Sequence, residues 1–134
     1  MRTSIKEATK FHGHLGPYLI LGILAGELAM KRLGCGKYFG LQVKVRGVDK
    51  KPKSCLVDGL QLATGATYGK GNIRKIKGSA VQILFRNLKN NKKITVNLKD
   101  SLKKKLGALE GHRDSEALAK KLATVNPLGL FIIR

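Results

Sequence analysis

The longest apolar pattern in the chain covers Pro17–Leu33 and predicts one central helix. Proline suits the first turn of a helix, and Gly34 suits the position just after the last turn. Gly22 and Gly26 stand four residues apart, so one face of this helix carries no side chains. A bare face of this kind favours close packing against another element.

Apolar and polar residues alternate in later stretches, which predict strands. The clearest is 41–47, where leucine and valine alternate with glutamine, lysine and arginine. A strong strand is expected over 80–85, with a hairpin partner over 93–98 across the Asn90-Asn91 turn. A further extended segment begins at Ile73.

Capping residues and helix breakers predict the shorter helices. Ser4 and Glu7 form a capping box, and Ser54 is expected to cap the helix that starts at the following residue. These helices are predicted over residues 4–10, 55–66, 99–106 and 115–123. Pro127 ends the last of them, and we expect the apolar stretch 128–133 to pack against the core or a partner subunit.

Helices and strands are mixed along the chain without a regular strand–helix alternation. This order favours an α+β fold, in which a mainly antiparallel sheet packs with helices. The length of 134 residues suits a single domain, residues 1–134, with its own core. Aromatic residues make up only 5% of the chain, so leucine, isoleucine, valine and alanine must build that core.

The charge widens the range of partners. Lys and Arg number 27 against 8 Asp and Glu, a formal net charge of +19. Such a surplus attracts polyanions, so nucleic acid is one candidate partner, and a lysine-rich solvated surface is the alternative. Against nucleic acid, aromatic residues for base stacking are few, and no RRM, KH, helix-turn-helix or zinc-finger motif is present.

The cysteine content and the N-terminal sequence bear on localisation. Two cysteines without a CxxC pair give no disulfide framework, which favours a reducing, cytoplasmic location. Residues 1–14 carry charges and histidines and lack the apolar core of a secretory signal. The apolar run of the central helix contains Glu27 and is shorter than the roughly 20 residues of a membrane span, so no membrane association is expected.

Candidate chemistry begins in FHGHLGP, residues 11–17, at the entrance to the central helix. In an extended segment His12 and His14 project to the same side, where two imidazoles can share one metal ion or one substrate. Histidine is the commonest metal ligand and the usual general base near neutral pH. The alternative is a loop with two polar histidines and no ligand.

Cys55 is the second candidate, at the N-terminus of the predicted helix 55–66. The helix dipole and free N–H groups at such a position lower the pKa of a thiol and favour the thiolate. Asp58 lies three residues on and faces the same side. One thiolate, one carboxylate and two imidazoles suit zinc or a similar divalent metal, and a buried, inert Cys55 is the alternative.

The third candidate is the glycine-rich stretch from Thr67 to Asn72. Gly69 and Gly71 let the backbone approach a ligand closely, successive N–H groups can form an anion-binding nest, and Lys70 adds a positive charge. The GxxxxGK[ST] pattern of a Walker A loop is absent. The stretch predicts a site for a small anion, with an ordinary turn as the alternative.

Three segments together carry a resemblance: FHGHLGP, CLVDGLQ and TGATYGKGN follow one another in this order. They resemble the signature segments of the FmdE family, which takes its name from a subunit of formylmethanofuran dehydrogenase. The resemblance covers residues 8–100 and leaves 101–134 as a helical C-terminal extension. It matches His12, His14, Cys55, Asp58, Gln61, Gly69, Lys70, Gly71 and Asn72 to the family's motifs.

The chain departs from this family's pattern at two positions, where Gly16 and Ala66 stand in place of motif cysteines. Neither residue can ligate through its side chain, so an iron–sulfur cluster, which needs about four thiolates, is not expected. The resemblance then implies a mononuclear site of His12, His14 and Cys55, completed by Asp58 or water. A degenerate pocket that binds an organic anion, or nothing, is the alternative.

These segments predict an accessory or stand-alone domain with one pocket between the His-x-His loop, the Cys55–Asp58 helix and the glycine-rich loop. The pocket would bind a divalent metal such as zinc, or a small anion held by Gln61 and the loop from Thr67 to Asn72. The resemblance implies a homodimer, or a place in a larger enzyme complex, and a link to one-carbon or molybdenum and tungsten enzymes. Whether the chain is an enzyme stays open. The alternatives are a basic nucleic-acid-binding protein and a catalytically silent structural subunit.

Overall fold

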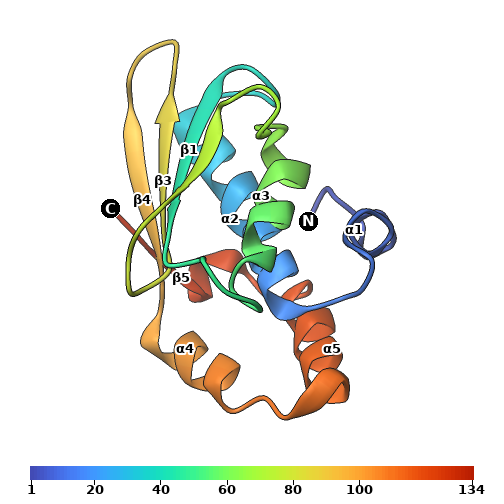
Figure 1. Cartoon of the computed structure of the whole chain (residues 1–134). Coiled ribbons are helices and arrows are strands. Elements are labelled where there is room, and N and C mark those ends of the chain that lie inside the picture. Colours follow the sequence, from blue (N-terminus) through green and yellow to red (C-terminus); the bar gives the residue numbers. More distant parts are fainter.

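The computed structural model describes all residues, 1–134, and consists of helices packed on one side of a five-stranded sheet (Figure 1). The helices are α1 (Ile5–His12), α2 (Pro17–Leu33), α3 (Cys55–Thr64), α4 (Asp100–Gly107), α5 (Gly111–Leu122) and the short 3-10 helix η1 (Pro127–Gly129). The strands are β1 (Leu41–Arg46), β2 (Ile73–Ile76), β3 (Gln82–Asn87), β4 (Lys93–Leu98) and β5 (Phe131–Ile133). The predicted α+β class is confirmed.

The sheet has the strand order β2-β1-β3-β4-β5 and is mainly antiparallel, as predicted. The pairs β1–β3, β3–β4 and β4–β5 are antiparallel, and only β2 runs parallel to its neighbour β1. This parallel pair arises because α3 connects β1 to β2 as a crossover over one face of the sheet. The predicted hairpin of β3 and β4 forms around Asn91, which adopts a left-handed φ of 62°.

Helix α2 lies at the centre of the core, between α3 and the sheet (Figure 1). Its predicted bare face packs directly on α3. A Cβ placed on Gly22 would lie 2.1 Å from the carbonyl oxygen of Leu56, and one placed on Gly26 would lie 2.9 Å from the side chain of Thr64. The two backbones therefore touch, and the position of Cys55 at the start of α3 is fixed by this contact.

Helix boundaries follow the predicted signals with two exceptions. Ser4 caps α1 by accepting a hydrogen bond from the Glu7 N–H at 3.0 Å, as expected. Ser54 does not cap α3, because its backbone is already helical (φ −60°, ψ −23°) within the preceding turn. Helix α5 begins at Gly111, four residues before the predicted start at residue 115.

The C-terminal stretch closes the sheet. Phe131 is only 3% exposed, so the predicted packing of this stretch against the core is confirmed. The sequence did not predict that it forms a strand, β5, beside β4. No single helix is long and apolar enough to cross a membrane; α1 and α2 pass that test only as a pair, and they meet at an angle of 120°.

Candidate metal centre

Two histidine rings meet at the junction of α1 and α2. Helix α1 ends at His12 because Gly13 adopts a left-handed φ of 101°, which turns the chain back on itself. The His14 ring consequently lies beside the His12 ring, with 4.7 Å between the ring centroids. The two rings share one side, as predicted, although a helix end places them there and not an extended strand.

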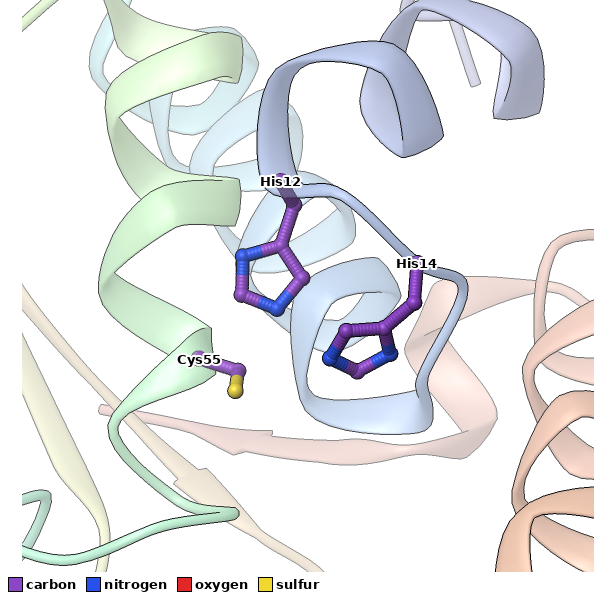
Figure 2. A group of neighbouring side chains, drawn as sticks. All are labelled: His12, His14 and Cys55. Atoms are coloured by element: carbon purple, nitrogen blue, oxygen red, sulfur yellow. The ribbon is translucent and has the colours of Figure 1, made fainter.

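Cys55 faces these rings from the first residue of α3 (Figure 2). One ligand atom each of His12, His14 and Cys55 lies within 4.8 Å of the other two. His14 is exposed, whereas His12 and Cys55 are half-buried. The fold therefore brings together the two imidazoles and the thiol that the sequence singled out.

Asp58 orients one of these ligands. Its Oδ2 lies 2.6 Å from Nδ1 of His12, a contact that favours the neutral tautomer in which Nδ1–H donates to the carboxylate and Nε2 is the acceptor. Nε2 of His12 is buried and has no hydrogen-bond partner. A buried acceptor without a partner is costly, and a metal ion in the group would satisfy it. Asp58 thus contacts a histidine, whereas the sequence had predicted it as one of the metal ligands.

The Cys55 thiol is not the low-pKa group that its helix position predicted. Burial raises its pKa above the ordinary value, and the neighbouring Asp58 carboxylate raises it further. The charge of Lys51 and a backbone hydrogen bond oppose this shift and do not overcome it. Without a metal the thiol is therefore protonated near neutral pH, and a metal ion would have to displace that proton.

A small cavity opens beside His14 and Cys55, and Gly16 is part of its lining. A Cβ built on Gly16 would lie 3.5 Å from Cε1 of His14, so a longer side chain there would extend toward the group. The cavity measures about 140 Å³, and Tyr18, His112 and Ser115 also line it. None of these three residues was predicted from the sequence: His112 and Ser115 belong to α5, beyond the segments that carry the motifs, and Tyr18 follows the FHGHLGP segment inside α2.

The glycine-rich loop lies at the opposite end of α3. This helix ends at Gly65, and its ten residues span about 15 Å from Cys55 to the loop. The loop is held by its own neighbours: Asn72 accepts from the Thr67 N–H at 2.9 Å and donates to the Tyr38 carbonyl at 2.7 Å. The prediction of a single pocket that includes this loop is therefore wrong within one chain. The length of α3 separates the loop from Cys55.

The other residues of that predicted ligand site make local contacts too. Gln61 accepts from the Tyr68 N–H at 3.2 Å, and the Lys70 ammonium donates to the Gly65 carbonyl. Ala66, the second position where a cysteine is replaced, is fully buried at this end of α3. Its replacement consequently has no bearing on the His12–His14–Cys55 group.

Asp58→Asn is expected to weaken zinc affinity about 10- to 100-fold, because removing a partner that orients a metal-bound histidine typically has this effect. Competition with a chromophoric chelator measures it. Asp100→Asn, on exposed α4, makes the same change in charge far from the group and serves as the control. Equal affinities of the Asp58→Asn variant and the unmodified chain would contradict the orienting role.

Fold and site together define an α+β domain with a candidate metal centre of two histidines and one thiol. A family model described as "FmdE, Molybdenum formylmethanofuran dehydrogenase operon" matches residues 11–126, so the chain belongs to the FmdE family. The resemblance noted in the sequence is thereby confirmed.

Two similar proteins extend this comparison. A probable S-adenosyl-L-methionine-binding protein of Archaeoglobus fulgidus is 36% identical over an alignment of 70 residues that covers 49% of this chain and 18% of that protein. This chain thus spans less than a fifth of that relative. The crystal structure of a tungsten formylmethanofuran dehydrogenase FmdE-like protein from Syntrophus aciditrophicus superposes with a TM-score of 0.70 and 23% identity, covering 97% of this chain and 68% of that one. It shows the shared fold.

Proposed function

We propose that this FmdE domain binds a divalent metal ion, such as zinc, through Nε2 of His12, a ring nitrogen of His14 and the Cys55 thiolate. The buried Nε2 without a partner carries the proposal, because the Asp58 carboxylate fixes the tautomer that leaves this atom free to ligate. Two imidazoles and one thiolate are a donor set that suits zinc. One thiolate does not suit an iron–sulfur cluster.

The proposed centre has three protein ligands and one open position. Zinc sites with four protein ligands are usually structural, whereas sites with three keep a position for water or substrate. The cavity beside Gly16 supplies the space, and its volume of about 140 Å³ limits the occupant to a small molecule. Burial raises the pKa of Tyr18, so its hydroxyl stays protonated and can donate to a small anion there.

The wider role follows from the family. Its description refers to the formylmethanofuran dehydrogenase operon, and the structural relative is described as similar to a subunit of that enzyme. We therefore place this domain beside, or within, an enzyme complex of one-carbon and molybdenum or tungsten chemistry, as a homodimer or as a subunit. The bound small anion would then be a one-carbon acid or a related carboxylate.

Loading the purified protein with zinc, or with cobalt as a spectroscopic substitute, tests the centre. We expect stoichiometric metal by elemental analysis and a near-ultraviolet thiolate-to-cobalt band in the unmodified chain. Cys55→Ser should remove that band, and His12→Ala should release the metal. Cys35→Ser is the matched control, since Cys35 follows the C-terminal end of α2, at the other end of that helix from Pro17. A chain that takes up no metal, or a band that depends on Cys35, would overturn the proposal.

A further inference from the structure

Besides the metal centre, the open face of the sheet also points to a ligand. Residues of β1 and β3 alternate between buried and half-buried, because the helices cover one face only (Figure 1). None of the five strands contains an aspartate or a glutamate. The strand positions that alternate with the buried ones, and so lie on the open face, include Lys44, Arg46, Arg74, Arg86 and Lys93.

These cations face one another across the strands. Lys44 is the direct neighbour of Arg74 on β2, and Arg86 is the direct neighbour of Lys93 on β4. Like charges directly opposite each other destabilise a sheet. Only two lysines pair with an acid, Lys103 with Asp100 at 3.8 Å and Lys120 with Glu116 at 3.3 Å, and both lie on helices. The open face therefore carries positive charge that the protein itself does not neutralise.

Arg86 is held in place on this face without losing its charge. Its Nε and Nη2 donate to the side-chain oxygen of Gln42 at 3.2 and 2.9 Å, and its Nη1 donates to that of Asn91 at 3.0 Å. Both partners are neutral amides, so the guanidinium keeps its charge, and two of its five N–H donors remain for an anion. Beside it, Lys44, Lys93 and Thr95 help to line a hollow of about 260 Å³.

Two exposed aromatic residues come just before β1, and one of them, Tyr38, lies against Gly65 at the C-terminal end of α3. Tyr38 is 54% exposed and Phe39 is 77% exposed. The Lys70 ammonium lies 5.9 Å from the centroid of the Tyr38 ring and 5.4 Å from that of Phe39. Tyr38 has a strained φ of 83°, which hydrogen bonds from the Asn72 side chain and to the Thr64 carbonyl hold in place. The Tyr38 backbone is thus held in place, and both exposed rings lie near the Lys70 ammonium.

We infer that this chain binds single-stranded nucleic acid, with phosphates on Arg86 and its neighbouring cations of the open face and bases stacked on Tyr38 and Phe39 beyond the start of β1. A positively charged track combined with aromatic rings is the usual arrangement for this ligand. The net charge of +19 favours a polyanion and disfavours a second copy of the chain on this face. The inference is independent of the metal centre, which lies among the helices on the covered side (Figure 2).

Fluorescence anisotropy with a labelled oligo(dT), with heparin as a polyanion without bases, tests the inference. We expect affinity to fall with salt at a log–log slope of about −0.7 for each phosphate neutralised. Arg86→Glu combined with Lys93→Glu should weaken oligo(dT) and heparin alike, at least tenfold. Phe39→Ala should weaken oligo(dT) about tenfold and leave heparin unchanged, because only the bases stack.

The matched control is Lys104→Glu combined with Lys105→Glu, which makes the same charge change on exposed positions of α4. Circular dichroism establishes that each variant is folded. The inference is overturned if the two double variants lose affinity equally, or if the unmodified chain fails to bind oligo(dT) at low salt. It is also overturned if the Arg86→Glu and Lys93→Glu changes dissociate a dimer, which would make this face a subunit interface.

Discussion

Gly59→Ala is expected to lower the free energy of unfolding by about 3 kcal/mol, the upper end of what overpacking usually costs. A Cβ on Gly59 would lie 2.1 Å from the Leu19 carbonyl oxygen, and Gly22 stands in the same relation to the carbonyl of Leu56. These obstacles are backbone atoms of two helices, so no rotamer change relieves the clash. Since domains are stable by only about 5–15 kcal/mol, the loss is a large share of the total.

Urea unfolding followed by circular dichroism measures this effect. Gly107→Ala is the control, because a Cβ at this helical position meets no atom within 4 Å and alanine favours a helix. The Gly59→Ala variant should also bind metal less well, because Cys55 starts the helix that the clash displaces. An unchanged urea midpoint would show that α2 and α3 are not in backbone contact.

Gly16→Cys is expected to raise zinc affinity on the order of 100-fold. Structural zinc sites with four ligands contribute about 10–16 kcal/mol, or roughly 3 kcal/mol per ligand. A Cβ at residue 16 would lie 3.5 Å from Cε1 of His14, so a thiol there can occupy the open position. The same change should abolish binding of a small anion at the metal, because the position is then filled.

Chelator competition again provides the measurement, and two variants separate the causes. Gly16→Ala adds bulk without a ligand and should leave zinc affinity within a few-fold. Ala66→Cys introduces a thiol at the other replaced position, at the far end of α3, and should not strengthen the site. An affinity that does not change in Gly16→Cys would show that residue 16 does not reach the metal.

The sequence predicted the fold well wherever a periodic pattern coincided with a clear end signal. Pro17–Leu33 became α2 with the predicted bounds, because proline and Gly34 mark both ends. Ser54 misled, since a serine before a helix can equally sit inside a turn that is already helical. Strand β5 was missed because three apolar residues at the chain end show no alternation, and only pairing with β4 makes them a strand.

The three candidate ligand residues of the site were predicted from the sequence, whereas the extent of the site was not. His12, His14 and Cys55 were singled out by residue type, and the fold brings them together. Spacing placed Asp58 on the correct side of α3, but spacing alone does not say whether a carboxylate meets a metal or a histidine. The separation of the glycine-rich loop could have been inferred, because it follows the C-terminal end of the helix that Cys55 begins.

Helix α1 has a weak hold on the rest of the chain. Only Ala8 of its eight residues is buried, whereas twelve of the seventeen residues of α2 are. Elements with so little buried surface open locally without global unfolding. His12 is the last residue of this helix, so an ion bound there would tie this loosely held helix to the rigid core. Metal uptake would then be coupled to the docking of α1 onto the core, and metal release to its local opening.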